Sequence, residues 1–83
     1  ALERVASFLR DIASADRMRP SQDGMVRLPM TRGEMADYLG LTIETVSRVM
    51  TRLKTENVIR LLSLGEVSIV RPDRLSALAD GET

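Results

Sequence analysis

The stretch that decides the fold is residues 31–48, TRGEMADYLGLTIETVSR. It begins with a capping box, in which the Thr31 hydroxyl accepts the third helical amide and the Glu34 carboxylate returns to the Thr31 amide. Gly40 is placed to end this first helix, because a left-handed residue after a helix is least costly as glycine. Thr42 is a second N-cap, so another helix is expected directly after it. The stretch therefore predicts two helices joined by a tight turn.

Two helices that cross steeply need particular residues at their contact. Ala36 is the small residue at the crossing, Gly40 supplies the turn glycine, and Val46 is the apolar residue of the second helix that faces back. Three further apolar residues complete the contact: Leu39, Leu41 and Val49. This pattern predicts a helix-turn-helix over about residues 32–55. The alternative is a plain helical hairpin in a small helical core.

The helix expected over residues 43–55 has two different sides. Four apolar residues share one of them: Val46, Val49, Met50 and Leu53. The other side is polar and consists of Glu44, Ser47, Arg48, Thr51 and Thr55, with Arg52 at its flank. Serine and threonine are poor helix formers, so this face is unusual for a merely solvated surface. Short polar side chains let a helix lie deep in a groove, where hydroxyls can bond phosphates or bases. The alternative is a tolerated solvent face with a Glu44–Arg48 ion pair.

The charges on this polar face suit a DNA base pair. An arginine can donate twice to guanine, and a carboxylate can accept from cytosine N4, so Arg48 and Glu44 could address both sides of one G·C pair. Phosphates repel a carboxylate, so Glu44 in a DNA groove needs a specific hydrogen-bond donor. Glu44 is therefore a stronger indication of base readout than an arginine alone. Thr42 with the nearby helix amides, and Arg32 on the preceding helix, suit phosphate contacts.

The rest of the chain is expected to build a small α+β domain around this motif. Apolar residues at three- and four-residue steps predict a first helix that ends before Pro20, followed by a short strand over residues 25–28. After the helix-turn-helix, the apolar period changes to two, which predicts a hairpin over residues 58–70 with its turn at 63–66. A last short helix begins at Pro72. This order of elements is typical of a winged helix-turn-helix.

The hairpin, or wing, is expected to be mainly structural. Its turn carries no lysine or arginine, and Glu66 would repel a phosphate. Four apolar residues of the wing are expected to cover the third helix: Ile59, Leu61, Val67 and Ile69.

Length and composition favour a single binding domain over residues 1–83 and disfavour an enzyme. The chain has no cysteine and no histidine, which excludes thiolate nucleophiles, histidine bases, disulfides and every Cys/His metal site. No cofactor is expected, and no apolar run is long enough to span a membrane. The net charge is zero, which by itself argues against a nucleic-acid binder. Residues 17–60, however, hold eight of the 12 basic residues and five of the 12 acidic ones, so the middle is mildly basic.

Residues 28–48 closely resemble the Crp/Fnr family of bacterial transcription regulators, and more narrowly the FNR/FixK branch. The resemblance implies a cytoplasmic regulator whose winged-helix domain reads a TTGAT-like half-site of an inverted repeat in the major groove. It implies that Arg48 and Glu44 address the G·C pair and that Ser47 addresses a neighbouring thymine. It matches Thr31, Arg32 and Thr42 to phosphate-contacting positions, and we expect Thr45 and Thr51 to contact phosphates as well.

The same resemblance implies parts beyond this chain. A β-roll sensor domain and a long dimerisation helix are expected upstream of Ala1, so the parent would be a homodimer. The loop Met18–Gly24 matches a surface with which family members contact RNA polymerase. The effector, the regulated genes and the choice between activation and repression stay open. The 83-residue chain alone is expected to be monomeric, because one core accounts for its apolar residues and no heptad pattern is present.

A protein–protein interaction module with the same winged-helix fold is the alternative function. The neutral net charge favours it. The short hydroxyl-bearing face with Glu44 and Arg48 disfavours it.

Overall fold

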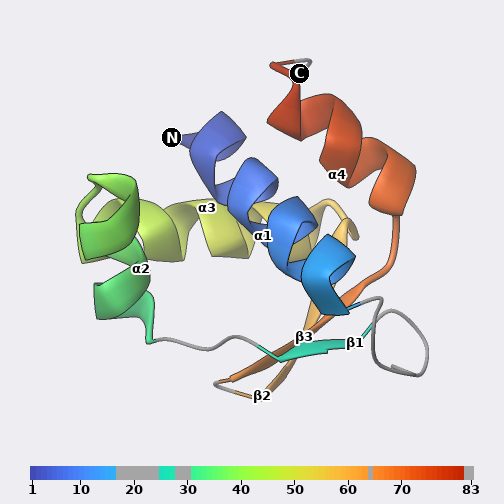
Figure 1. Ribbon diagram of the computed structural model, residues 1–83, viewed down its shortest axis with the longest axis horizontal. Coiled ribbons are helices and arrows are strands. Elements are labelled where there is room, and N and C mark those ends of the chain that lie inside the picture. The colour runs from blue at the N-terminus through green and yellow to red at the C-terminus, as the bar shows by residue number, and fades with distance from the viewer. Residues whose placement is uncertain (17–24, 28–30, 64, 82–83) are drawn as a thin grey trace.

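The structure is a computed structural model that describes residues 1–16, 25–27, 31–63 and 65–81. Its elements follow in the order α1 (Leu2–Asp16), β1 (Met25–Arg27), α2 (Arg32–Leu39), α3 (Ile43–Thr55), β2 (Ile59–Ser63), β3 (Glu66–Ile69) and α4 (Pro72–Ala79). Figure 1 shows α1 crossing in front of α3, with α2 at one end of α3, α4 beside α1, and the sheet below the helices. The predicted α+β winged helix-turn-helix is confirmed.

The sheet joins the short strand near the N-terminus to the wing. Its strand order is β1-β3-β2, and both pairings are antiparallel. Within the wing, Ile59 pairs with Ile69 and the register shifts between Leu61 and Ser63. Ser63 and Glu66 form the last pair of the ladder, so they are the first and last residues of the turn, as predicted for residues 63–66. The hydroxyl of Ser63 also donates to the Glu66 carboxylate at 3.3 Å, which closes the end of the hairpin.

The ends of α2 are determined by the residues that the sequence indicated. The Thr31 amide donates to the Glu34 carboxylate at 2.9 Å, and the Glu34 amide donates to the Thr31 hydroxyl at 3.2 Å, which completes the capping box. Gly40 has a φ of 70°, and the next amide, of Leu41, donates to the Ala36 carbonyl at 2.8 Å. This left-handed closure turns the chain sharply toward α3.

Like α2, α3 begins at a threonine N-cap and is followed by a left-handed residue, but that residue is not a glycine. Thr42 accepts the Thr45 amide at 3.1 Å and so caps the first turn. At the other end, Asn57 has a φ of 60° and the Val58 amide donates to the Leu53 carbonyl at 2.9 Å. Asparagine tolerates this left-handed conformation better than other non-glycine residues. The predicted bounds of the helix, residues 43–55, are confirmed.

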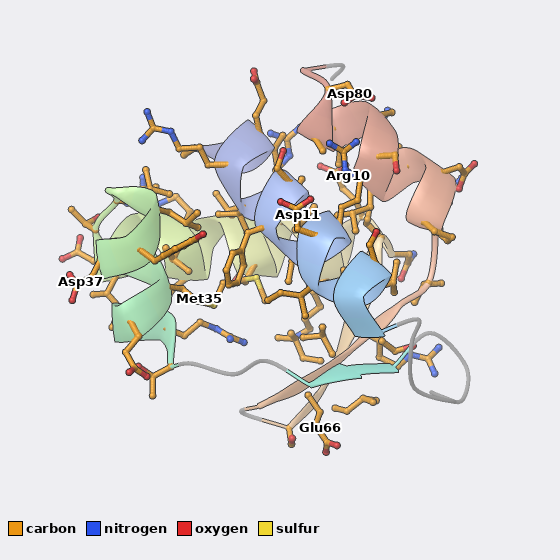
Figure 2. The ribbon with its side chains drawn as sticks, in the orientation of Figure 1. Arg10, Asp11, Met35, Asp37, Glu66 and Asp80 are labelled. Carbon is orange, nitrogen blue, oxygen red and sulfur yellow. The ribbon has the colours of Figure 1, made fainter. Side chains whose placement is uncertain are left out.

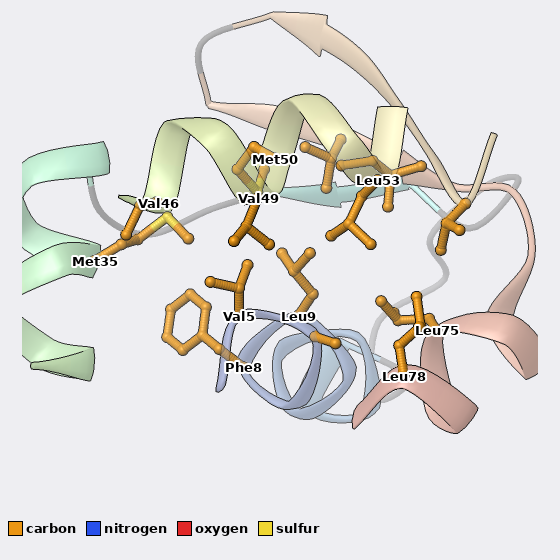
Figure 3. Packing of buried hydrophobic residues seen from close by; sticks show 14 of the residues in the cluster. Val5, Phe8, Leu9, Met35, Val46, Val49, Met50, Leu53, Leu75 and Leu78 are labelled. Atoms are coloured by element: carbon orange, nitrogen blue, oxygen red, sulfur yellow. The ribbon is translucent and has the colours of Figure 1, made fainter. Parts of the chain in front are cut away.

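The hydrophobic core of the described residues lies between all four helices and the inner side of the sheet, with Met35 and Ala36 as the contribution of α2. The four residues predicted for the inner side of α3 are all buried: Val46, Val49, Met50 and Leu53. Figure 3 shows Val5 and Leu9 of α1 pointing toward this side of α3, with Leu75 and Leu78 of α4 beside them. Ala36 is also buried, and Leu39 and Leu41 pack half-buried against the core. The predicted contact between the two helices of the motif is therefore confirmed.

The packing of α4 on α1 brings the beginning and the end of the described chain together. Arg10 donates to the Asp80 carboxylate at 3.1 Å, a contact visible at the upper right of Figure 2. Ser7 donates to the Ala79 carbonyl at 3.4 Å in the same contact region. These two bonds join residues that lie 70 or more positions apart in sequence.

Several large apolar side chains lie outside this core. Leu61 is 37% exposed, so the prediction that it covers α3 is wrong, whereas Ile59 and Val67 are buried as expected. Leu61 stands further along the hairpin than Ile59, next to the register shift, and extends past the core. The other exposed large apolar residues of the described part are Tyr38, Ile43, Leu62 and Val70. The premise that one core accounts for all apolar residues therefore fails, while the monomer itself stays a prediction.

Candidate nucleic-acid interface

The exposed side of α3 forms one continuous surface, which we call the outer α3 face. Its side chains line a shallow, open depression and come from the first three turns of the helix: Ile43, Glu44, Ser47, Arg48 and Thr51. All five are exposed, whereas the opposite side of the helix is buried. The structure thus brings the three predicted base-reading residues and Thr51 together on one surface.

The two charges of the outer α3 face are not engaged with each other. Within the described residues, Glu44 and Arg48 form no ion pair or side-chain hydrogen bond, although they are four residues apart. One turn further on, Arg52 donates to the Glu56 carboxylate at 2.7 Å across the same spacing. The ion pair on which the alternative of a solvated face relied is therefore not formed between these two described residues, and both groups keep their hydrogen-bonding capacity for a ligand.

Ile43 is a member of this surface that the sequence did not indicate. It is 52% exposed and lies beside Glu44 at the start of α3. Its Cδ1 approaches Gly33 of α2, at 3.8 Å from the position that a Cβ on that glycine would take. The only available signal was an apolar residue directly after an N-cap, on the side of the helix that is otherwise polar.

Thr42 and Thr45 act as a pair at the start of α3. The Thr42 hydroxyl oxygen accepts the Thr45 amide, and its proton goes to the Thr45 hydroxyl at 2.9 Å. Thr45 therefore retains a hydroxyl proton that it can donate outward, whereas Thr42 is occupied as the cap. Of the two predicted phosphate contacts, Thr45 has the better side-chain donor.

Thr31 and Arg32 lie at the start of α2. The Thr31 oxygen is occupied by the capping box, as described above, which leaves its hydroxyl proton. The Arg32 guanidinium contacts the Met35 sulfur at 3.9 Å and, in the described part of the chain, has no carboxylate partner. Partial burial lowers the pKa of Arg32 from its usual value, because desolvation penalises the charged form. The Arg32 guanidinium is thus partly desolvated and has no carboxylate partner among the described residues, so a phosphate is a suitable partner for it.

Three further features concern the expected polymerase-contacting loop, membrane spans and metal sites. The loop Met18–Gly24 lies outside the described residues. Among residues that are described, no helix is long and apolar enough to cross a membrane, and no three His, Cys, Asp or Glu side chains are placed to share a metal ion.

Comparison with known proteins gives concordant results. A family model described as the Crp-like helix-turn-helix domain matches residues 3–78. The nitrogen fixation regulation protein FixK of Rhizobium meliloti is 45% identical over 80 residues, which are 96% of this chain and 36% of FixK. The transcriptional activator protein FnrL of Cereibacter sphaeroides is 52% identical over 65 residues, covering 74% of this chain and 26% of FnrL.

A solved structure agrees with these relatives. FixK2 from Bradyrhizobium japonicum superposes with a TM-score of 0.80 at 39% identity, over 93% of this chain and 37% of the FixK2 chain. The chain thus spans only about a third of the length of such relatives. The relatives are named as regulation and activator proteins, in agreement with a binding module rather than an enzyme. The chain belongs to the Crp-like helix-turn-helix family, the DNA-binding domains of Crp/Fnr transcription regulators.

Proposed function

We propose that this domain places the outer α3 face in the major groove of double-stranded DNA and reads a TTGAT-like half-site there. The observation that carries the proposal is the pair of unengaged charges on an exposed helix face. An exposed Glu and Arg at this spacing normally attract each other, as Arg52 and Glu56 do. Glu44 and Arg48 instead stand side by side along a face of short side chains, free to contact bases.

The chemistry of the face matches the composition of that half-site. TTGAT contains one G·C pair, and the face carries one arginine and one carboxylate. Arg48 donates to guanine O6 and N7, and Glu44 accepts from the paired cytosine N4. Ile43 supplies an apolar contact for a thymine methyl group, and the Ser47 hydroxyl bonds a neighbouring thymine. These four contacts address the bases that distinguish the half-site.

Phosphate contacts surround the base-reading residues. Thr42 and Thr45 present a hydroxyl proton and the first free amides of α3, where the helix dipole favours an anion. Arg32 and Thr31 supply a cation and a hydroxyl from the start of α2. Thr51 supplies a hydroxyl two turns into α3. Such contacts fix the register of the helix on the duplex but carry no sequence information.

The parent protein would act as a homodimer on an inverted repeat in the bacterial cytoplasm. A sensor domain and a dimerisation helix would lie in the remaining two thirds that relatives such as FixK possess. Contact with RNA polymerase through residues 18–24 belongs to the same proposal.

The proposal is tested by fluorescence anisotropy with short duplexes. The wild-type chain is titrated onto one TTGAT half-site and onto the three duplexes in which the G·C pair is replaced. We expect each replacement to weaken binding by about 1–3 kcal/mol, and a salt increase to weaken binding to all four duplexes. Equal affinity for all four at every salt concentration would exclude base readout by this face and would favour the protein–protein module.

A further inference from the structure

A small hollow opens between α1 and α2, away from the outer α3 face. Its volume is about 260 Å³, and its walls are formed by Phe8, Asp11, Ile12, Tyr38 and Leu39. We propose that this hollow binds one arginine side chain of a partner polypeptide. The guanidinium stacks on Tyr38 and pairs with Asp11, while the arginine stem fills the apolar space between the two helices.

The first argument is the state of the Tyr38 ring. It is 71% exposed, although tyrosine side chains are usually of intermediate burial. Its ring leans on that of the buried Phe8, with centroids 5.6 Å apart and planes inclined by 53°. The contact holds the Tyr38 ring in position and leaves most of its surface accessible. A planar guanidinium stacks on such a ring and is attracted by its quadrupole.

The second argument is the charge at the rim of the hollow. The Asp11 carboxylate is exposed, and Figure 2 shows it on the front of α1. The neighbouring arginines of α1 have other partners: Arg4 donates at 3.2 Å to the backbone carbonyl of Leu39, at the edge of the hollow, and Arg10 pairs with Asp80. Within the described chain no cation neutralises Asp11. The hollow therefore selects a positively charged occupant.

The third argument is that apolar, aromatic and acidic side chains line the hollow together. Ile12 and Leu39 give an apolar lining that an aliphatic stem can cover, next to an aromatic face and a carboxylate. Arginine matches all three parts, because its stem is apolar and its weakly hydrated guanidinium both stacks and forms directed hydrogen bonds. Lysine matches the charge but not the stacking geometry. The volume suits a single side chain rather than a helix.

The position of the hollow keeps it independent of DNA binding. Val5 and Leu9 of α1 pack against the buried side of α3, so the core separates the hollow from the outer α3 face. The two surfaces share no lining residue. A partner bound through its arginine would therefore leave Glu44 and Arg48 free for bases. The inference does not depend on the proposed half-site.

The test uses two blocked pentapeptides, each with a central arginine or its neutral isostere citrulline between alanines. Both are titrated into the isotopically labelled chain and followed by NMR. The arginine peptide should shift the resonances of the residues that line the hollow, and the citrulline peptide should bind about two- to fivefold more weakly. A lysine peptide should fall between them. Equal binding of arginine and citrulline, shifts centred elsewhere, or no shifts at millimolar peptide would overturn the proposal.

Variants separate the hollow from general charge attraction. Tyr38→Leu and Asp11→Asn should each weaken the arginine peptide about two- to fivefold, whereas DNA affinity stays unchanged. Asp37→Asn is the matched control, because Asp37 precedes Tyr38 but does not line the hollow, and Figure 2 shows it on the side of α2 away from Asp11. An equal loss with Asp37→Asn would show that only net charge matters and would overturn the proposal. Asp11→Asn keeps the test valid if Tyr38→Leu destabilises the fold.

Discussion

An acid and an arginine four residues apart occur at each end of α3, the second pair formed with the C-cap residue Glu56, and the two pairs are in different states. In the first half, Glu44 and Arg48 are four residues apart and unpaired, whereas in the second half Arg52 and Glu56 are four apart and bonded at 2.7 Å. The order of the charges differs: the acid precedes the base in the first half, which is the better order for an isolated helix. The pair with the better intrinsic order is nevertheless the unpaired one. We call the part of α3 with Glu44 and Arg48 the open half, and the part with Arg52 and Glu56 the bonded half. Propensity therefore does not decide the state of these pairs, and the open half is suited to an external ligand.

Removing the arginine of the open half should have the largest effect. Arg48→Ala should weaken binding to the preferred half-site by about 1–3 kcal/mol and relax discrimination at its G·C pair. The measurement is the anisotropy titration on the four duplexes that differ at this pair. Arg52→Ala serves as the control, because it also removes one positive charge from α3 but from the bonded half. If both variants lost discrimination between the four duplexes to the same degree, the proposed difference between the two halves would be contradicted.

Removing the acid of the open half gives a smaller effect with opposite signs on different DNA. Glu44→Ala takes a negative charge away from a polyanion, so binding to random duplex should be unchanged or tighter. Binding to the preferred half-site should weaken, because the cytosine N4 donor loses its acceptor. Competition between the two duplexes measures the change in selectivity. If the variant stays as selective as the wild type, Glu44 is only a favourable charge at a helix N-terminus.

A phosphate contact outside α3 should behave differently from both. Arg32→Ala should weaken binding on every sequence to a similar degree, because phosphates carry no base information. The slope of log affinity against log salt should become shallower by about 0.9 for the lost contact. Titrations at several salt concentrations on preferred and random duplexes measure this slope. A loss confined to the preferred duplex would assign Arg32 to base readout instead.

The bonded half should give the smallest effect, on stability alone. The hydrogen bond from Arg52 lowers the pKa of Glu56, with weaker contributions from the Arg52 and Arg74 charges. A carboxyl whose pKa is lowered on folding stabilises the fold above its unfolded pKa, and this contribution disappears as pH falls through the folded pKa. The wild type should therefore be slightly more stable than Glu56→Gln at neutral pH, and the difference should vanish in acid. Urea unfolding at several pH values measures it, and a difference that grows in acid would contradict the assignment.

The sequence was most informative where local chemistry decides the structure. Both ends of α3 and the capping box at Thr31 follow from hydrogen bonds between residues three to five positions apart, which can be inferred without tertiary information. The buried side of α3 follows from helical periodicity, which any compact fold must satisfy. The winged helix-turn-helix and the surface with Glu44, Ser47 and Arg48 could therefore be predicted from helix caps and the periodicity of apolar residues.

The sequence was least informative where side chains meet distant neighbours or none. The exposure of Ile43 and Leu61 depends on where the core ends, which the pattern of a single element does not contain. The open state of Glu44 and Arg48 is a choice of side-chain conformation that spacing alone leaves undetermined. The hydrogen bond that the Thr42 hydroxyl donates to the Thr45 hydroxyl likewise requires the geometry of the helix start.

The contact between α1 and α4 has a consequence for the order of folding. The helices of the motif are neighbours in sequence, and their contact forms at little entropic cost. The Arg10–Asp80 and Ser7–Ala79 bonds must instead close loops of 70 or more residues. We expect the transition state for folding to contain the α2–α3 contact and to lack the α1–α4 contact, since long-range contacts tend to form late. A variant such as Arg10→Ala would then unfold faster while folding at the rate of the wild type.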